Sequence, residues 1–294
     1  MSALQRLMPM IVAFVGVGFL ALMDAFMKGA ALAAGAYTAS LLRSLFGVVL
    51  IAPIWLAGRP KWPRGPIMRL HVQRGVISAF MGLSWFFALT RLPIAEAIAL
   101  SFIAPILALY FASILLGEHI RKEAIWASLL GFVGMAVIVW GRLGTGELTA
   151  DLAWGLAALL FSALLYAYQF VVIRRQSQLA GPVEIATFHA GISGAVQLLG
   201  APLLFVVPQA QALGDIAIAA GLTVAGSLAV AWSYARAEAQ VLVPIEYTGF
   251  VWAALFGWIM FGEQVTLATV AGAALIVTGC WIAARRQRTE QTAI

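Results

Sequence analysis

The chain has a single cysteine, Cys280, among its 294 residues. One cysteine excludes an internal disulfide framework and any metal site built from several cysteines. Charged residues are also scarce, at 10% of the chain. Because Cys280 lies inside the last long apolar stretch, we expect it to be a packed thiol and not a reactive one.

The motifs of common enzyme sites are missing as well. The sequence contains no His-Glu-x-x-His zinc motif, no Gly-x-Ser-x-Gly nucleophile elbow and no Gly-x-x-x-x-Gly-Lys phosphate loop. The glycines of residues 141–146 superficially resemble a phosphate cradle, but no strand precedes them. We therefore expect no enzyme and no cofactor, and an intramembrane enzyme is the less favoured alternative.

Apolar residues, in contrast, are abundant. They make up 63% of the chain, and the mean hydropathy is +0.98, more apolar surface than a soluble domain buries. A membrane-spanning helix needs about 20 apolar residues. Glycines, prolines and charges divide the sequence into ten such spans, at residues 7–28, 36–57, 74–92, 94–116, 124–141, 152–173, 183–207, 214–236, 241–261 and 266–284. The sequence predicts an all-α integral membrane protein with ten transmembrane helices.

Basic residues are distributed unevenly over the loops between these spans. When the loops are assigned alternately to two sides, 14 basic residues lie on one side and three on the other, with Arg43 inside a span. Cytoplasmic loops carry the excess of lysine and arginine, so we expect both termini in the cytoplasm. This orientation explains the net charge of +6 without nucleic-acid binding.

One stretch of the sequence occurs twice. Shifted by 145 residues, Arg91–Gly134 falls on Arg236–Gly279, with eight identical positions and the same order of apolar span, Gly-Glu pair, polar break and apolar span. Five spans per half is an odd number, so the second half enters the membrane from the opposite side. We expect inverted repeats at residues 1–148 and 149–294. Such architectures place a substrate site near the midplane and operate by alternating access.

Together these features resemble the drug/metabolite transporter superfamily, and within it two tandem EamA-type repeats. The residues that carry the resemblance are the arginine that ends Tyr37–Arg43 and the pairs Gly117-Glu118 and Gly262-Glu263. The overall sequence also resembles the YddG-type exporters of aromatic and other neutral amino acids. The resemblance implies a basket-like bundle in the bacterial cytoplasmic membrane, with the fifth and tenth spans at its periphery.

Ionisable side chains inside the spans are candidates for function because burying them in a bilayer is costly. Asp24 and Lys28 are four residues apart and share a helical face. Arg43 enters the second span near the depth of Asp24. We expect an Asp24–Arg43 ion pair, extended to Lys28. This group is either a structural clamp between the first two spans, or an outer gate or substrate-carboxylate contact.

Four carboxylates lie near the ends of spans. Glu246 follows Pro244 about one turn into the ninth span and is either a proton-coupling group or a hydrated rim residue. Glu96 lies in the first turn of the fourth span, where the helix dipole stabilises an acid. Glu118 and Glu263 each follow a glycine, and we expect both to accept hydrogen bonds from unpaired amides of the following helix.

Polar and small side chains recur at helical spacing in several spans. The stripes are Ser78, Gly82 and Trp85; Ser162, Tyr166 and Gln169; His189, Ser193 and Gln197; and Thr223, Ser227 and Tyr234. We interpret those of spans three, six and seven as the lining of a wet cavity, with helix packing as the alternative. Trp85, Tyr166 and Trp252 either form a stacking wall or simply pack. Gly131, Gly134 and Gly272 favour close packing in spans five and ten.

The sequence thus predicts a secondary exporter of amino acids or related small metabolites. The candidates for substrate binding or gating are Asp24, Lys28, Arg43, Ser78, Trp85, Tyr166, Gln169, His189, Gln197, Glu246 and Trp252. Arg43 or Lys28 would bind the substrate carboxylate, and Gln169, Gln197 or Glu246 its amine. Alternatives are a carrier for another metabolite or drug class, a channel and a membrane receptor. No metal is expected, and no oligomeric state is favoured.

Overall fold

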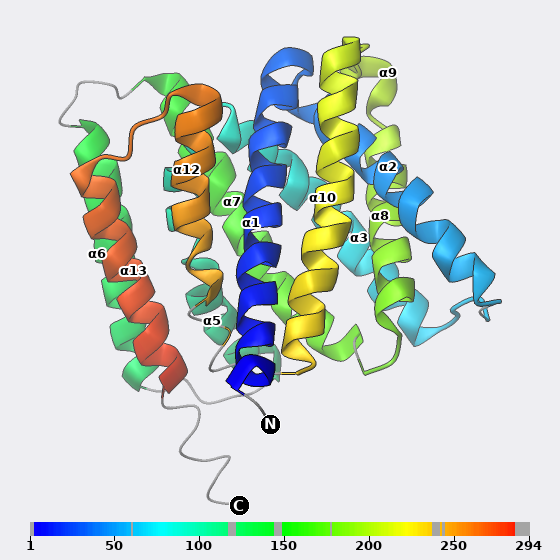
Figure 1. Cartoon of the computed structure of the whole chain (residues 1–294), viewed down its shortest axis with the longest axis horizontal. Helices are drawn as coiled ribbons and strands as arrows, with labels where there is room; N and C mark the ends of the chain where they lie inside the picture. Colours follow the sequence, from blue (N-terminus) through cyan, green and yellow to red (C-terminus); the bar gives the residue numbers. More distant parts are fainter. Residues whose placement is uncertain are drawn as a thin grey trace, which may run out of the picture.

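The computed structural model describes residues 3–59, 61–116, 122–143, 149–176, 178–236, 242 and 245–285. These residues form helices joined by short connections (Figure 1). The helices are α1 (Ala3–Ala34), α2 (Ala36–Ala57), α3 (Pro66–Leu89), α4 (Ile94–Ser101), α5 (Ala104–Leu116), α6 (Lys122–Leu143), α7 (Ala150–Gln176), α8 (Pro182–Leu198), α9 (Ala201–Leu204), α10 (Ala210–Tyr234), α12 (Gly249–Phe261) and α13 (Leu267–Arg285). The described residues contain no strand, and the predicted all-α fold is confirmed.

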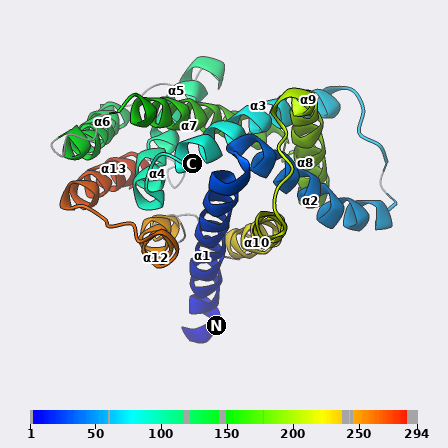
Figure 2. The same ribbon diagram turned by 90° about the horizontal axis from the view of Figure 1, so that it is seen from above.

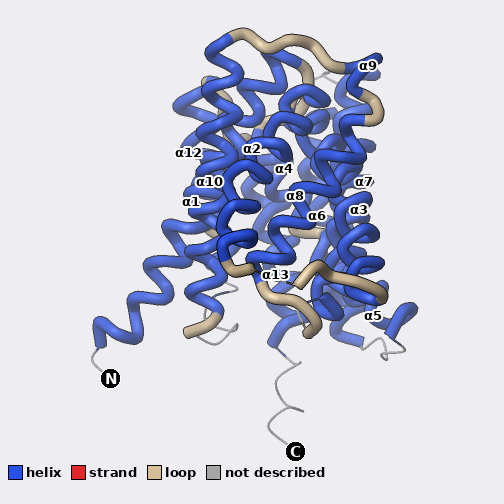
Figure 3. The backbone as a smooth tube through the Cα atoms, turned by 90° about the vertical axis from the view of Figure 1, so that its right-hand side faces the viewer, coloured by secondary structure: helices blue, strands red, loops and turns tan. Residues whose placement is uncertain are grey.

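The chain runs up and down through one bundle. Successive segments alternate in direction, and the start of α1 and the end of α13 lie at the same end, which we call the terminal end (Figures 1 and 3). The opposite end, where α1 meets α2, is called the far end. Since α4 with α5 and α8 with α9 each form one interrupted segment, the described helices trace the ten expected passages.

The outer surface of the bundle is apolar. Six described helical segments are long and apolar enough to cross a membrane, and α12 and parts of α6 and α13 are shorter apolar helices. Large apolar side chains face outward without protein cover: Leu199 is 83% exposed, Leu203 90% and Leu267 84%. Such a surface is stable in lipid and would aggregate in water. The protein is therefore an integral membrane protein.

The two halves contact each other in a symmetric pattern. Helix α1 of the first half packs along α10 of the second, and the corresponding helix α7 packs along α3 (Figure 2). Helix α2 contacts its counterpart α8, and α6 contacts its counterpart α13. This reciprocal pairing of antiparallel halves is the inverted repeat that the odd number of spans predicts. The boundary expected between residues 148 and 149 borders the undescribed residues 144–148 and stays a prediction.

Helices α6 and α13 meet at glycines at one edge of the bundle (Figure 2). A Cβ added at Gly134 would lie 2.5 Å from the carbonyl oxygen of Gly272, and one added at Gly272 would lie 2.4 Å from that of Gly134. Only glycine permits this approach of two backbones. The predictions of close packing and of a peripheral place for these two spans are confirmed.

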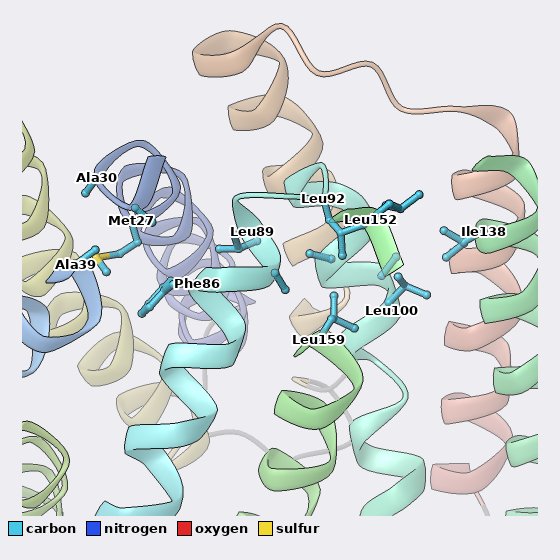
Figure 4. Close-up of a cluster of buried hydrophobic side chains, with 14 of the residues drawn as sticks. Met27, Ala30, Ala39, Phe86, Leu89, Leu92, Leu100, Ile138, Leu152 and Leu159 are labelled. Atoms are coloured by element: carbon cyan, nitrogen blue, oxygen red, sulfur yellow. The ribbon is translucent and has the colours of Figure 1, made fainter. Parts of the chain in front are cut away.

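A core of buried apolar side chains joins α1, α3, α4 and α7 near the far end (Figure 4). Met27 of α1 and Leu89 of α3 are fully buried, and Leu100 of α4 and Leu159 of α7 are at most 1% exposed. These residues come from both halves of the chain. The far end is therefore a packed junction between the halves.

Two helix boundaries differ from the predicted spans in an informative way. The third span was expected to begin at residue 74, but α3 begins at Pro66, after Gly65 with φ +63°. A proline in the first turn is a common helix start, and it outweighs the charges that follow. The fourth span is interrupted between Ser101 and Ala104, just before Pro105, which lacks the amide hydrogen that would continue the helix. Pro244, the other expected kink site, lies outside the described residues.

Candidate functional site

The far end is held by a cluster of polar contacts between the halves, the far-end clamp, formed by Lys28, Leu92, Ile94 and Glu263. The Lys28 ammonium forms an ion pair with Glu263 Oε1 and donates a hydrogen bond of 2.6 Å to the Leu92 carbonyl oxygen. Glu263 Oε2 accepts a hydrogen bond of 2.8 Å from the Ile94 amide. The clamp therefore joins α1 and the start of α4 to the connection between α12 and α13.

The local backbone explains the position of Glu263. Gly262 ends α12 in the left-handed conformation, with φ 66°, and turns the chain back. Glu263 then folds over α12, where a Cβ added at Gly257 would lie 2.5 Å from Glu263 Oε2. Two glycines thus allow one carboxylate to reach both Lys28 and Ile94.

These contacts correct one prediction about Glu263. Its carboxylate was expected to accept from amides of the following helix, but it accepts from the Ile94 amide in the other half. Thr266 performs the expected capping role instead, since its hydroxyl accepts from the Thr269 amide at 3.1 Å. Glu118, for which the same role was expected, lies outside the described residues.

The predicted ion pair between Asp24 and Arg43 is also wrong in its details. No salt bridge joins them in the described structure, and Lys28 pairs with Glu263 instead of joining this group. Asp24 accepts a hydrogen bond of 2.9 Å from the indole nitrogen of Trp85. The Asp24 carboxylate is still within electrostatic range of Arg43, without direct contact.

Two further contacts surround the far-end clamp. Arg91 donates a hydrogen bond of 2.7 Å to the Asp151 carboxylate, and Thr269 donates one of 3.1 Å to Glu96. Glu96 lies in the first turn of α4, as expected, and is only 2% exposed. A cleft of about 310 Å³ opens beside these groups, lined by Lys28, Thr90, Arg91, Leu92, Pro93, Thr149, Asp151, Leu152 and Glu263. Its charged side chains are already paired with each other.

Arg43 lies deeper in the bundle and has a different environment. Its guanidinium lies over the Phe86 ring at 5.3 Å, and its Nε is buried without a hydrogen-bond partner in the described structure. A Cβ added at Gly82 would lie 3.7 Å from Arg43 Nη2 and 3.5 Å from the Ser40 hydroxyl. Arg43 is thus a half-buried cation that contacts an aromatic face and, within the described residues, forms no salt bridge.

Gln197 of α8 lies in the same region. Its amide nitrogen donates to the Ser40 hydroxyl at 3.0 Å and to the Ala79 carbonyl oxygen at 3.1 Å. Tyr37 donates to the backbone carbonyl of Gln197. The side-chain oxygen Oε1 of Gln197 is buried and accepts no hydrogen bond within the described residues. The region around Ser40 therefore offers an acceptor at Gln197 and a cation at Arg43.

The stripes expected to line a cavity mostly join helices. Gln169 of α7 donates to the Ser78 hydroxyl of α3 at 2.7 Å, and Ser162 donates to the Met81 carbonyl oxygen at 3.0 Å. Gln169 is 2% exposed and Ser78 4%. The polar groups of these side chains form hydrogen bonds between α3 and α7. They therefore join helices, which was the alternative to lining a cavity.

Two other candidates, Tyr166 and Glu246, are exposed. Tyr166, in the middle of α7, is 43% exposed and packs on Phe170 with ring centroids 4.9 Å apart. Glu246 is exposed and accepts a hydrogen bond of 2.5 Å from the Tyr234 hydroxyl. The Tyr166 hydroxyl lies within electrostatic range of both Glu246 and Arg74. These groups therefore share one polar region on the terminal-end side of the midplane.

The remaining two candidates are His189 and Trp252. His189 makes no hydrogen bond within the described residues and lies in electrostatic range of both Arg74 and Arg43. His189 therefore differs from a typical core histidine, whose ring nitrogens form hydrogen bonds. Trp252 packs on Phe14 and Phe256, with centroids 5.0 and 5.6 Å away, and its indole nitrogen is buried without a partner there.

Arg74 was missed because it was expected at the very edge of a span. Since α3 begins at Pro66, Arg74 lies two turns inside the helix. It donates a hydrogen bond of 3.0 Å to Gln176, whose amide contacts the fully buried His71 at 2.7 Å. Its Nε is buried without a hydrogen-bond partner in the described structure. The Gly65-Pro66 pair was the sequence signal that would have placed Arg74 inside the bundle.

The described residues contain no group of three or more histidine, cysteine or carboxylate side chains that could hold a metal ion. The polar groups gather instead in two regions. The far-end clamp is fully paired, whereas the region that includes Arg43, Arg74 and Gln197 has donors and an acceptor without partners. The donors and the acceptor without partners in this second region are available to a small polar molecule.

Comparisons with known proteins agree with this architecture. The family model described as "EamA-like transporter family" matches residues 4–140 and again residues 153–285. The pseudopaline exporter CntI of Pseudomonas aeruginosa is 26% identical over 270 residues, covering 90% of this chain and 92% of that protein. A riboflavin transporter of Brucella anthropi is 23% identical, covering 79% of this chain and 82% of its own length. An S-adenosylmethionine uptake transporter of Rickettsia prowazekii is 24% identical, covering 71% and 69%.

One solved crystal structure has the same fold. It aligns with a TM-score of 0.61 at 21% identity and covers 98% of this chain and 100% of its own. The paired family matches, the transporter relatives and the inverted helical bundle lead to one conclusion. The chain belongs to the EamA-like transporter family and is a membrane transporter of small molecules, not an enzyme.

Proposed function

We propose that this transporter exports amino acids or related small metabolites across the bacterial cytoplasmic membrane. The observation that carries the proposal is the environment of Arg43, a half-buried side chain. Its Nε is buried without a partner, and no carboxylate forms a salt bridge with it in the described structure. A charge inside a bilayer protein is costly unless it is paired or serves function. A substrate carboxylate would provide the missing partner.

The groups around Arg43 suit the rest of an amino acid. Asp24 lies within electrostatic range, and Gln197 Oε1 is an acceptor without a donor. Either oxygen would accept from a substrate ammonium. The rings of Trp85 and Phe86 on α3 border the same groups and would cover an apolar side chain.

Alternating access explains the different packing of the two ends. The far-end clamp closes one end between the halves, at Lys28 and Glu263. The exposed Tyr166 and Glu246 lie toward the terminal end, where a substrate would enter in this conformation. The excess of basic residues in the terminal-end loops supports a cytoplasmic position of that end. The structure would then correspond to an inward-facing state, and the opening of the clamp would release substrate outside.

The experiment is uptake into proteoliposomes containing the purified protein. Labelled aromatic, neutral and acidic amino acids are compared, with and without a proton gradient, and riboflavin and S-adenosylmethionine are included because relatives carry those names. Saturable uptake of amino acids supports the proposal. Uptake of no amino acid by folded protein would overturn it and favour another metabolite class. Electrical currents without saturation would indicate a channel.

A further inference from the structure

Two half-buried arginines, Arg43 and Arg74, share an unusual property. The Nε atoms of Arg43 and Arg74 are buried and have no hydrogen-bond partner in the described structure. Neither arginine forms a salt bridge with a described carboxylate. An arginine guanidinium presents a fork of donors that matches a carboxylate. The two side chains therefore form two places where a carboxylate would complete the local hydrogen bonding.

The two arginines lie along one face of α3, and we call them and this face the two-arginine path. Gly82 of α3 lies beside Arg43, because a Cβ added at Gly82 would lie 3.7 Å from Arg43 Nη2. Arg74, Ser78 and Gly82 follow one another at four-residue spacing on one face of α3. The Arg43 guanidinium lies at the level of Gly82, and the rise along α3 from Gly82 to Arg74 is about 12 Å. His189 lies in electrostatic range of both.

The nearby acids are already engaged elsewhere. Asp24 accepts from the Trp85 indole at 2.9 Å, and Glu246 accepts from the Tyr234 hydroxyl at 2.5 Å. On the acceptor side, Gln197 Oε1 has no donor within the described residues. A molecule with two anionic groups and one hydrogen-bond donor would therefore complement the Nε atoms of the two arginines and Gln197 Oε1.

We propose that the preferred substrate is an amino acid that carries a second carboxylate, with its α-carboxylate at Arg43 and its distal carboxylate at Arg74. Gln197 Oε1 would accept a hydrogen bond from its ammonium group. This assignment rests on the proposed transport of amino acids and narrows it to acidic amino acids. Arg43 recognises the part that all amino acids share, and Arg74 is the specificity-determining residue.

The test is uptake into proteoliposomes of amino acids that differ in the distal group. Glutamate is compared with glutamine, which has nearly the same shape without the second charge, and α-aminopimelate extends the chain across the gap. We expect at least about tenfold higher affinity for the diacids than for glutamine, the usual strength of an added charge-assisted contact. Glutamine transported as well as or better than the diacids would overturn the inference and leave the proposed function standing.

The matched variants are Arg74→Gln and Arg69→Gln on the same helix. Arg69 is exposed near the terminal end. The substitution Arg69→Gln therefore removes the same charge from α3 without changing the two-arginine path. In Arg74→Gln, the ratio of diacid to glutamine uptake should fall toward one, and Arg69→Gln should keep the wild-type ratio. A purely structural role of Arg74 would lower uptake of all substrates equally, and that result would overturn the assignment. Uptake of no amino acid by the folded wild type would overturn the proposed function itself.

Discussion

The far-end clamp and the two-arginine path both contain charged side chains inside the bundle, but the two regions differ in how many of their polar atoms have partners. In the clamp, Lys28 has a carboxylate and a carbonyl, and Glu263 has an ammonium and an amide. In the path, Arg43 and Arg74 each retain a buried Nε without a partner in the described structure. Charges that are paired within the protein stabilise its structure, whereas polar atoms without a partner are available to bind a ligand.

This difference also separates the two mechanical roles of a carrier. Side chains that bind each other across the halves determine which end is closed. Side chains that lack partners determine what is carried. Breaking the clamp should therefore change stability and the balance of conformations, while breaking the path should change affinity.

The largest effect is expected from Glu263→Gln. The glutamine side chain keeps an oxygen that accepts from the Ile94 amide, but it is neutral and leaves the Lys28 ammonium without its counter-ion. Both sites are largely buried, since the side chains of Lys28 and Glu263 are 8% and 14% exposed. Removing one partner of a buried pair costs about 3 kcal/mol. The measurement is thermal unfolding of the purified protein in detergent.

A second measurement follows the opening of the clamp directly. A cysteine introduced by Leu92→Cys in a Cys280→Ser background should react faster with a membrane-impermeant maleimide when Glu263→Gln is also present than when it is not.

The control is the double variant Lys28→Met with Glu263→Gln. Methionine removes the charge that the first substitution isolates, so part of the lost stability should return. An unchanged melting temperature in Glu263→Gln, with an unchanged labelling rate, would show that the clamp does not hold the halves together.

The next largest effect is expected from Arg43→Gln on transport. The variant loses the cation that would bind the substrate carboxylate. Loss of a charged hydrogen bond of this kind should lower substrate affinity roughly tenfold to hundredfold. Substrate affinity in proteoliposomes is the measurement. Because Arg43 contacts Phe86 but no carboxylate, the melting temperature should fall less than in Glu263→Gln. Full uptake by Arg43→Gln would remove it from the site.

A smaller effect is expected from Gln169→Leu. Gln169 joins α7 to Ser78 of α3 by a hydrogen bond of 2.7 Å. Its loss should destabilise the protein by about 1 kcal/mol, the net value of a buried neutral hydrogen bond, and should leave substrate affinity nearly unchanged. Equilibrium unfolding and uptake of the same preparation test both parts. A large loss of affinity at wild-type stability would return Gln169 to the substrate path.

The architecture could be predicted from sequence because it depends on hydropathy and charge summed over many residues. Ten apolar segments, the odd number of spans per half and the glycines of α6 and α13 need no knowledge of individual contacts. The glycine pair Gly134 and Gly272 is a case where two small residues alone indicated a helix contact that the structure contains.

The partners of individual side chains were harder to predict. Lys28 was grouped with Asp24 because the two share a helical face, but the carboxylate that binds it, Glu263, is 235 residues away. Arg74 was placed in a loop because its charge masked the helix start at Pro66. Long-range pairing depends on tertiary packing, which spacing along one helix does not contain.

The smallest effect is expected from Asp151→Asn, the matched comparison for the clamp. Arg91 and Asp151 also join the two halves at the far end, through a contact of 2.7 Å, but the Asp151 side chain is 69% exposed. Water and salt screen such a pair, so its loss should cost less than about 1 kcal/mol. Thermal unfolding beside Glu263→Gln tests the contrast. Equal losses in the two variants would show that the position between the halves, and not burial, determines what these charges contribute.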